Sequence, residues 1–522
     1  MHANPVPLQN LAAFCTILIT AVQSLNRWLC HPVICVLQFQ GAVCIFILAC
    51  GWVWAGYMRS REVHRLQSLN LQHIALRLVA SHGVSSQKGS CPAPSAGDNS
   101  KVCLPGVTVV LPIQGYKSHS LLNWQSQLSM QYAGPVEYIF VTQSAADPAL
   151  AVLQKMSCEY EAARTQVVTS GASSSCSQKI HNLQRGILEA SRDSKYVLCL
   201  DDDIQLHPGF LQMSVDRMER NPAAFMLTGY PFDIPDPGAG VLSYAALVYH
   251  LPLLIAFSVS QNTSFVWGGC MLFPAAHMVN DTYGIMQAWN DGGYSDDLIV
   301  AAKCAEHGLK ILCPSGASFP QRLEAHYSWR QYWNYLRRQL YVMDTYATKS
   351  NKRINHSLML IHSYLSWAIV LPATTAFLRL LLWLAELILL PSQKIWDGPG
   401  TSWDWLRIFG AQGCHAGMVS SILFWLGTAS AVLALCWMTG VILALFKELS
   451  PGDSSPPQHD CFSWFKLWLG FYLTNAVLPC CMLYTYFNPW VEWGGIWYAK
   501  SKGKVKRLPG RVYGSQKQTL GG

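Results

Sequence analysis

Long apolar runs near both ends of the chain constrain its fold more than any other feature. Pro32–Tyr57 is apolar except for Gln38 and Gln40, and the basic segment Met58–Arg61 follows it. Because about 20 apolar residues are enough for a helix to cross a bilayer, this run predicts a membrane anchor. Its basic flank predicts that the next part of the chain lies in the cytosol. Leu11–Leu25 is shorter, and we expect it either to lie at the membrane interface or to span.

Apolar runs return in the last third of the chain. Met418–Phe446 and Trp464–Phe487 are each long enough to span a bilayer. Met359–Leu371 and Leu378–Leu390 are too short to span separately, and they predict one broken span, a hairpin or a re-entrant pair. A cytosolic C-terminus would require an even number of crossings after the middle of the chain.

The middle of the chain has the composition of a water-soluble domain. Hydrophobic residues make up 51% of the chain and charged residues only 13%, but most of the acidic residues lie within 101–350. We therefore predict an N-terminal membrane anchor at 1–58, a linker at 59–103, an α/β domain at 104–350, membrane helices at 351–499 and a basic cytosolic tail at 500–522. Serine, glycine and proline predict flexible segments at Ser85–Ser100 and Ser450–Asp460.

The formal net charge of +8 is densest near the C-terminus. The basic residues there are Lys500, Lys502, Lys504, Lys506, Arg507 and Arg511. They predict either a solvated tail or a patch that faces anionic lipid. No basic face with interleaved aromatic residues occurs in the soluble part, so we do not expect nucleic acid as a partner. Trp490, Trp493 and Trp497 predict an aromatic belt at the membrane interface, and a substrate box is the alternative.

Short apolar runs alternate with helix-like stretches in the soluble part. The apolar runs are Val107–Leu111, Tyr138–Val141 and Tyr196–Leu200. Between them, Ala149–Met156 and Ile180–Glu189 have helical character. Strands that alternate with helices indicate a parallel α/β sheet, and such sheets bind ligands beyond the carboxyl ends of their strands.

Three consecutive aspartates, Asp201 to Asp203, follow the last of these strands. Adjacent carboxylates repel one another, and a divalent cation such as Mg²⁺ or Mn²⁺ would stabilise them while neutralising a diphosphate. An acidic turn that caps the next helix is the alternative. Asp147 follows another strand, and Asp296 and Asp297 begin a helix-like segment. Carboxylates are therefore expected at three sheet-edge or turn positions.

Six segments together carry a specific resemblance to a known family. They are Cys176–Asn182, Tyr196–Asp203, Thr228–Pro231, Trp267–Met271, Asp291–Asp297 and Tyr332–Gln339. Through them, the region 107–346 resembles inverting nucleotide-sugar glycosyltransferases, and within these the ceramide glucosyltransferases, particularly the plant type. The resemblance implies a GT-A (Rossmann-like) α/β catalytic domain with a mostly parallel sheet, flanked by transmembrane α-helices.

The resemblance also implies roles for the acidic residues. The three aspartates of the family pattern match Asp147, Asp201 and Asp297. Asp147 and Asp201 would bind the donor, Asp201 and Asp203 would hold the divalent metal, and Asp297 would be the catalytic base. The neighbouring Asp296 is a possible alternative to Asp297, or a cap or orienting group.

Basic and amide residues complete the implied donor site. Lys179 and Asn182 match a segment that lies near the nucleotide in the superfamily. Arg337 matches the arginine of the (Q/R)xxRW motif, but the tryptophan is missing, and Asn334 stands where Gln or Arg is expected. Arg337 and Arg338 remain suitable partners for a diphosphate.

Two weaker signals leave alternatives open. His250 would be either a hydrogen-bonded structural histidine, which we expect, or a marker of the acceptor side. The glycines of Trp267–Gly269 would either let the backbone approach a sugar ring or form a tight turn.

The resemblance implies UDP-glucose as the donor and ceramide, within the membrane lipid, as the acceptor. It further implies a multi-pass membrane protein of the endoplasmic reticulum or Golgi with a cytosolic catalytic domain. Two other classes stay open. A processive polysaccharide synthase normally keeps the tryptophan of the motif, which is absent here. A catalytically inactive lipid-binding scaffold does not need the intact aspartates.

Overall fold

The computed structural model of the protein describes residues 8–82, 104–160, 164–397, 414–451, 457 and 459–508. The chain divides into two compact units. The helical unit comprises Met1–Val53, Ile361–Cys436 and Asn475–Pro479, and the α/β unit comprises Trp54–Leu360, Trp437–Thr474 and Cys480–Gly522. The segment 85–100, most of 450–460 and the end of the basic tail lie outside the described residues.

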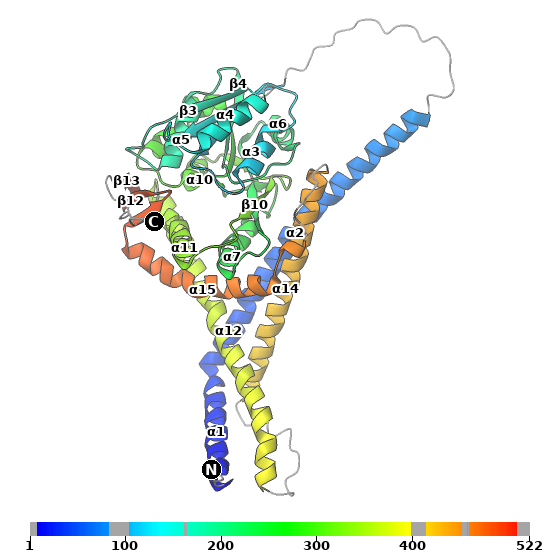
Figure 1. Ribbon diagram of the computed structural model, residues 1–522, viewed down its shortest axis with the longest axis vertical. Coiled ribbons are helices and arrows are strands. Elements are labelled where there is room, and N and C mark those ends of the chain that lie inside the picture. The colour runs from blue at the N-terminus through cyan, green and yellow to red at the C-terminus, as the bar shows by residue number, and fades with distance from the viewer. Residues whose placement is uncertain are drawn as a thin grey trace, which may run out of the picture. The chain divides into compact units, whose positions relative to one another are not determined.

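The α/β unit, which Figure 1 shows as a sheet with its helices, is built on an eight-stranded mixed sheet. The strand order in this sheet is β3-β2-β1-β4-β8-β5-β9-β7. Its strands are β1 (Gly106–Ile113), β2 (Val136–Thr142), β3 (Arg164–Thr169), β4 (Ser194–Leu200), β5 (Ala224–Thr228), β7 (Asn262–Thr263), β8 (Cys270–Pro274) and β9 (Lys310–Leu312). Strands β3, β2, β1 and β4 run parallel, whereas β8 is antiparallel to both of its neighbours. The three strands predicted from apolar runs are β1, β2 and β4, and the predicted mostly parallel α/β sheet is confirmed.

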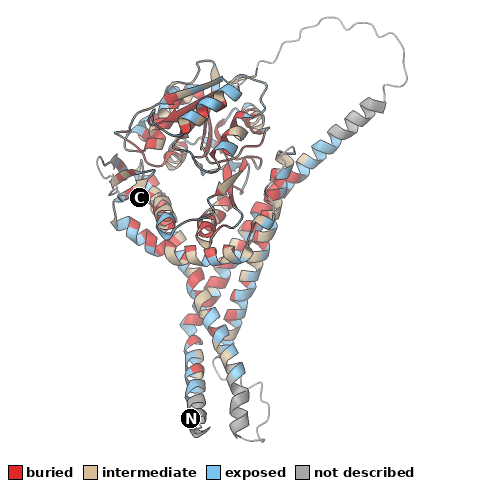
Figure 2. Cartoon of the chain, in the orientation of Figure 1, coloured by how far each residue is buried: buried red, intermediate tan, exposed pale blue. Residues whose placement is uncertain are grey.

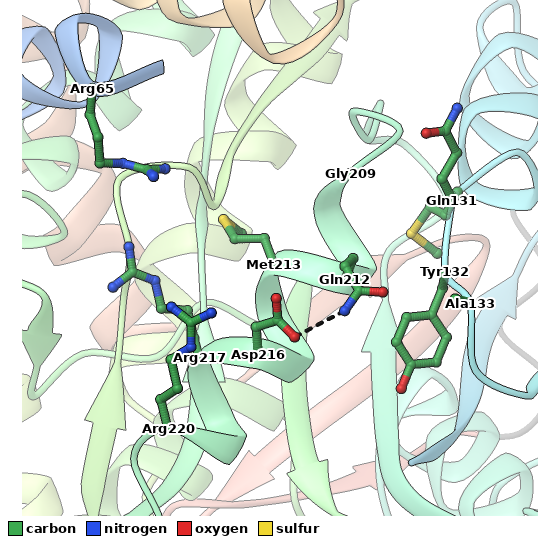
Figure 3. A pocket seen from close by; sticks show the side chains of 11 residues that line it. Arg65, Gln131, Tyr132, Ala133, Gly209, Gln212, Met213, Asp216, Arg217 and Arg220 are labelled. Atoms are coloured by element: carbon green, nitrogen blue, oxygen red, sulfur yellow. Dashed lines mark hydrogen bonds between the residues drawn. The ribbon is translucent and has the colours of Figure 1, made fainter. Parts of the chain in front are cut away.

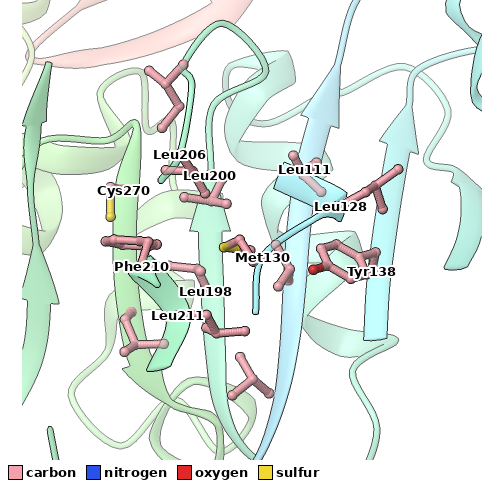
Figure 4. Close-up of a cluster of buried hydrophobic side chains, with 14 of the residues drawn as sticks. Leu111, Leu128, Met130, Tyr138, Leu198, Leu200, Leu206, Phe210, Leu211 and Cys270 are labelled. Atoms are coloured by element: carbon pink, nitrogen blue, oxygen red, sulfur yellow. The ribbon is translucent and has the colours of Figure 1, made fainter. Parts of the chain in front are cut away.

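Helices cover both faces of this sheet because its strands are apolar on both sides. Val109 and Leu111 of β1 belong to one buried cluster, part of which is drawn in Figure 4, and Val110 belongs to the cluster on the opposite face. Helix α5 (Gln178–Leu188) adds Ile180 and Leu183 to the second cluster. Full burial of each such side chain contributes about 1.5–3 kcal/mol. This packing positions the first turn of α5 beside the end of β4.

The other helices of the α/β unit connect its strands. They are α3 (Ser120–Leu128), α4 (Ala149–Glu159), α6 (Phe210–Glu219), α7 (Val241–Ala256), α8 (Ala275–Val279), α9 (Ile285–Asn290), α10 (Asp296–Glu306) and α11 (Trp329–Met343). A two-stranded parallel sheet, β6 (Tyr230–Pro235) with β10 (Ser318–Leu323), leads into α7 and α11. Helix α11 begins with a capping box, in which Gln331 N donates to the Ser328 hydroxyl over 3.3 Å.

The C-terminal residues form a three-stranded antiparallel sheet where a basic tail was expected to begin. Its strands are β11 (Trp490–Trp493), β12 (Ile496–Ser501) and β13 (Lys504–Arg507). Gly494 and Gly495 have φ of 56° and 75°, which suits a two-residue hairpin turn. The alternating lysines follow the period of a strand, because the intervening Val505 is buried against Tyr294 and Tyr341.

Among the described residues, four helices are long and apolar enough to cross a membrane: α2 (Pro32–His82), α12 (Lys349–Asp397), α14 (Cys414–Leu449) and α15 (Trp464–Phe487). Helix α1 (Leu8–Leu29) covers the shorter N-terminal run. Helix α12 is continuous through both short apolar runs, so neither a hairpin nor a re-entrant pair forms there. Figure 2 shows that much of the surface of these helices is exposed.

The helical unit contains a buried arginine. Arg379 of α12 donates to Gln38 Oε1 of α2 over 2.9 Å and to the Ser421 hydroxyl of α14 over 2.5 Å. Gln38 in turn donates to Thr375 over 3.0 Å. Polar groups inside apolar helices therefore bind one another and hold α2, α12 and α14 together.

One arginine of the basic segment after the predicted anchor is buried, although this segment was expected to be a solvated flank. Arg59 is buried within the α/β unit, where it donates to the hydroxyls of Ser258 over 2.5 Å and Ser318 over 3.3 Å. Arg61 remains exposed. Arg59 therefore binds the part of α2 that lies within the α/β unit to the rest of that unit, instead of acting as a solvated flank.

Candidate active site

The aspartate turn at the end of β4 is held by backbone and amide hydrogen bonds. Asp201 N donates to Gly269 O over 3.0 Å. From α3, Gln127 donates to Asp201 O over 2.9 Å, and Asn123 donates to Asp202 O over 3.3 Å. Because the main chain is fixed in this way, the three carboxylates project from a rigid turn.

Lys179, in the first turn of α5, joins two carboxylates that are far apart in the sequence. Its Nζ lies 2.8 Å from Asp201 Oδ1 and 3.0 Å from Asp296 Oδ2, and it donates to Gly268 O over 3.3 Å. Burial alone would lower the pKa of Lys179, but Asp201 and then Asp296 raise it above its usual value. Lys179 is therefore a fixed positive charge at the centre of the acidic group.

The acidic group has more negative charge than its lysines neutralise. Burial raises the pKa of Asp201 to about 7 despite Lys179, and burial raises the pKa of Asp202 to about 6 despite Lys117, whose Nζ lies 4.0 Å away. Asp203 Oδ1 is buried and has no hydrogen-bond partner. These features fit a further cation beside Asp201 and Asp203.

The carboxylate set suits a metal shared with a substrate. Among the described residues, no group of three or more His, Cys, Asp or Glu side chains has the arrangement of a metal site. Two protein carboxylates are nevertheless enough for Mg²⁺, which is usually bound by one or two carboxylates together with substrate phosphates and water.

The aspartate turn opens into a hollow of about 550 Å³. Of the predicted site residues, the structure brings five into its lining: Lys179, Asn182, Asp201, Asp203 and Arg338. Asn182 is also bonded internally, since its Oδ1 accepts from Ser170 Oγ over 2.7 Å. Positive and negative groups thus meet in one hollow, as binding of a metal–diphosphate requires.

Asp147 lies outside this lining. Its carboxylate accepts from Gly115 N, with both oxygens 3.1 Å away, and from Ala149 N over 2.9 Å. Gly115 has a φ of 70°, a conformation that favours glycine. Asp147 therefore connects the loop after β1 with the start of α4, and its direct neighbours are backbone amides.

The two neighbouring arginines of α11 point to different places. Arg338 lines the hollow, with its Cζ 5.1 Å from the ring centroid of Trp493. Arg337 is buried, donates to Trp490 O over 2.5 Å and lies 4.8 Å from the ring of Tyr484. Adjacent residues on a helix diverge by about 100°, so only Arg338 faces the hollow.

We expect Arg338→Ala to raise the donor KM roughly 10-fold to 100-fold, the effect of losing a hydrogen bond to a charged group. Arg337→Ala is the matched control. It should lower the melting temperature, because it removes a bond to the C-terminal sheet, and should change the donor KM little. Steady-state kinetics with varied donor and thermal unfolding of both variants provide the measurement. The reverse pattern would assign the donor contact to Arg337.

Asp296 and Asp297 are the first two residues of α10, and the carboxylates of both lie against Gly268. Gly268 N donates to Asp297 Oδ2 over 3.3 Å, and a Cβ at Gly268 would lie only 2.4 Å from Asp296 Oδ2. Asp297 also accepts from Leu298 N over 2.8 Å and from the Ser295 hydroxyl. Glycine is needed at position 268 because the Asp296 carboxylate packs directly against it.

The environment of Asp297 makes its carboxylate a stronger base than an ordinary aspartate. Burial, and then the charge of Asp296, raises the pKa of Asp297 above the usual value for an aspartate. Burial, and then the charge of Asp297, also raises the pKa of the Tyr249 phenol. Asp297 does not line the hollow itself, but Gly268 links it to Lys179, because Gly268 N donates to Asp297 and Gly268 O accepts from Lys179.

His250 was expected to be a structural histidine, and the structure places it in the lining of the hollow. Its Nδ1 lies 2.7 Å from Asp233 Oδ2, and its Nε2 lies 3.1 Å from the hydroxyl of Tyr335. Burial alone would lower the pKa of His250, but Asp233 raises it above its usual value. No pattern in the sequence marks this pair, because 17 residues separate Asp233 from His250.

We expect Asp233→Asn to move the alkaline limb of the kcat/KM–pH profile to lower pH. The raised pKa keeps His250 protonated to higher pH, so loss of the carboxylate charge lets the ring deprotonate earlier as pH rises. Tyr335→Phe is the control, because it removes a contact to the same ring without removing that charge. An unchanged alkaline limb in Asp233→Asn would exclude a role for protonated His250.

The sequence also missed several other residues of the hollow. Lys117 and His119 come from the loop after β1, Gln143 follows β2, and Trp493 and Tyr498 come from the C-terminal sheet. No motif marks them, although Gln143 follows a predicted strand, which is a usual place for a ligand contact. Trp493, expected in a membrane belt, packs on Arg338 in the hollow.

A second hollow, of about 900 Å³, lies elsewhere in the α/β unit and is drawn in Figure 3. Its lining includes Arg65, Arg217 and Arg220 together with Asp216, which accepts from Gln212 over 2.9 Å. None of the predicted site residues lines it. Although this hollow is larger than the one at the end of β4, we do not assign it as the candidate active site.

The sheet carries an acidic hollow at the carboxyl end of β4, and the residues of this hollow suit an enzyme that binds a metal together with a diphosphate. The sequence model described as Glycosyl transferase family 21 matches residues 66–410, well over half of the chain. The protein belongs to glycosyl transferase family 21, which includes ceramide glucosyltransferases.

Two further comparisons add little to this assignment. No curated protein matches the chain. Among solved structures, the mannosyltransferase PcManGT from Pyrobaculum calidifontis in complex with GDP-Man and Mn²⁺ is 13% identical and aligns over 79% of this chain and 100% of its own, with a TM-score of 0.36. A similarity of this size carries no functional information.

Proposed function

We propose that the protein transfers glucose from UDP-glucose to the primary hydroxyl of ceramide and inverts the anomeric centre to give β-glucosylceramide. The observation that carries this proposal is the hollow at the end of β4, where Asp201 and Asp203 face Lys179 and Arg338 in a chain of family 21. Helices long enough to span a membrane support a lipid acceptor, because a lipid reaches the enzyme from the bilayer.

The charged residues of the hollow would bind the donor. Arg338 would bind the diphosphate, while Lys179 orients Asp201 through their 2.8 Å ion pair. Asp201 and Asp203 would hold Mg²⁺ or Mn²⁺, which, when bound, neutralises the charge that develops on the leaving diphosphate. The buried Asp203 Oδ1, which lacks a hydrogen-bond partner, is the feature that favours this role.

Asp297 would act as the base for the acceptor. As the hydroxyl oxygen of the lipid bonds to the anomeric carbon, its proton passes to the Asp297 carboxylate. The bond from that carbon to the diphosphate oxygen breaks, and its electron pair leaves with UDP. The raised pKa of Asp297 suits proton acceptance.

We further propose that the protein lies in the membrane of the endoplasmic reticulum or Golgi and that its α/β unit faces the cytosol. The chain supplies its own reporter of sidedness, because Asn280-Asp281-Thr282 is an N-glycosylation acceptor and Asn280 is exposed. We expect Asn280 to stay unmodified. We also expect protease added outside sealed microsomes to cut the α/β unit. Glycosylation of Asn280 would place the domain in the lumen.

The activity is tested with purified protein in lipid vesicles that contain a mixture of lipid acceptors. With UDP-glucose, mass spectrometry should detect a β-linked monohexosylceramide and no longer product. A ladder of longer sugars would indicate a processive synthase, and UDP release equal to a no-enzyme control would indicate an inactive scaffold. UDP-galactose and GDP-mannose serve as matched donors for sugar selectivity.

A further inference from the structure

Helix α15 has the length and composition of a membrane span, but both of its ends are bound to the α/β unit. It contains 24 residues and is one of the four candidate spans. At a rise of 1.5 Å per residue, its ends are about 36 Å apart. A helix of this length crosses a bilayer only if its ends lie on opposite sides.

The N-terminal end of α15 is attached to α7. Ser463 N donates to the Tyr244 hydroxyl over 2.7 Å, and Lys466 Nζ donates to Ala239 O over 2.8 Å. A Cβ at Gly470 would lie 2.9 Å from Ala245 N, so the two helices are in direct backbone contact there. Thr474 also donates to Ala245 O over 2.7 Å.

The C-terminal end of α15 is attached to α11 and the C-terminal sheet. The ring centroid of Tyr484 lies 5.7 Å from that of Trp333. Lys500 of β12 donates to Thr485 O over 2.7 Å. Farther back along the helix, the Tyr332 hydroxyl donates to Thr474 over 3.0 Å. The same α/β unit therefore binds the helix near its start, in its middle and at its end.

The position of the C-terminal sheet gives an independent argument. Tyr498 of β12 accepts from Gln178 N over 3.0 Å, so this sheet is on the same side of the membrane as the aspartate turn. Between the end of α11 and this sheet, the part of the chain that the structure describes contains three candidate spans, α12, α14 and α15. Three crossings would place the sheet on the opposite side, so one of these helices does not cross.

We propose that α15 lies in the plane of the membrane surface on the side of the α/β unit, where its outer face binds the lipid bilayer. Helices α12 and α14 then form the two crossings after the α/β unit. The proposal rests on the attachments of α15 and is independent of the sugar and lipid used as substrates.

The exposed face of α15 fits a bilayer. The residues that share this face are Phe465, Leu469, Tyr472, Cys480, Leu483 and Phe487. They recur every three or four residues, with one longer gap, and none is charged. Phe465 and Phe487, near the two ends, are 78% and 79% exposed, whereas Leu467 and Cys481 on the opposite face are buried. Figure 2 shows exposed residues toward both ends of α15. Because the exposed side chains of this face are uncharged and mostly apolar, the face suits an apolar partner.

Two observations favour lipid over a protein partner. The start of α15 follows the end of α14 by only 15 residues, from Leu449 to Trp464, which keeps the helix near the membrane that α14 would cross. Exposed Trp329 and Trp490 lie on segments that contact α15, and tryptophans concentrate at membrane interfaces.

Glycosylation mapping of the full-length chain tests the position of α15. An Asn-Ser-Thr acceptor within a glycine–serine linker is inserted after Ser450, between α14 and α15, and compared with the native acceptor Asn280 in the α/β unit. Both should stay unmodified, while the same insert between α12 and α14 is glycosylated. Protease added outside sealed microsomes should cut the linker after Ser450.

The outcomes separate this proposal from the proposed sidedness. If the insert after Ser450 and Asn280 differ in modification, α15 crosses the membrane and the proposal fails. If both are modified, the α/β unit is lumenal, which contradicts the cytosolic assignment and leaves the position of α15 intact.

Fluorescence quenching tests lipid contact directly. A fluorescent amino acid at Leu469, in phosphatidylcholine vesicles, should be quenched most by lipids brominated near the headgroup. The same residue at Leu188, which is exposed at the end of α5, should be quenched little. Equal quenching at both positions, or strongest quenching by lipids brominated at the chain end, would overturn the proposal.

Discussion

Asp297→Asn is expected to lower kcat about 10²-fold to 10⁴-fold while the donor still binds, because a general base contributes on this scale. A primary alcohol is a weak nucleophile at neutral pH, and an amide cannot accept its proton. The variant should fold, since the Asn side-chain oxygen can still accept from Leu298 N, which donates to Asp297 over 2.8 Å. Donor binding and product formation are measured on the same purified protein.

Asp296→Asn separates the base from its neighbour. Asp296 contacts Lys179 Nζ at 3.0 Å and packs against Gly268, so its replacement should weaken donor binding more than it lowers kcat. If Asp297→Asn turns over like the wild type and Asp296→Asn is inactive, the base is Asp296. If both variants keep full activity, neither residue is the base.

Asp203→Asn is expected to reduce turnover about 10²-fold or more, in line with the loss of one electrostatic contact to a developing charge. Asp203 Oδ1 binds no protein group in the structure, so the substitution breaks no hydrogen bond at that atom and should leave the melting temperature nearly unchanged. Asp201→Ala should also lose activity, but it additionally removes a partner of Lys179. Chelation by EDTA should reproduce the loss in the wild type.

Metal binding itself supplies a second readout for this prediction. Calorimetric titration of Mn²⁺ in the presence of UDP should detect binding to the wild type and much weaker binding to Asp203→Asn. Asp202→Asn is the matched control, since its carboxylate faces Lys117 instead. Full activity in EDTA, or in Asp203→Asn, would exclude the metal role of these aspartates.

Local patterns in the sequence were enough to predict the framework of the protein. Apolar runs with the right period predicted β1, β2 and β4, because strands buried on both faces need continuous apolar residues. The same reasoning predicted that Asp201 stands at the carboxyl end of β4. Long apolar runs predicted the candidate membrane spans, since length and hydropathy are sufficient for that inference.

The sequence pattern could not predict the direction in which individual side chains point. The choice between Arg337 and Arg338 depends on the rotation of α11 against the C-terminal sheet, where the Trp490 carbonyl binds Arg337. The pairing of His250 with Asp233 depends on how α7 packs beside β6. Such contacts join residues from different elements, so no spacing along the chain records them.

The sequence by itself determined that three apolar runs are strands, that several longer runs are apolar enough to span, and that carboxylates follow β4, because each of these follows from neighbours along the chain. Only the tertiary structure decided that the lysines after residue 500 belong to a sheet and that both ends of α15 bind the α/β unit. Hydropathy measures how apolar a helix is, whereas its direction relative to a membrane depends on what its two ends bind.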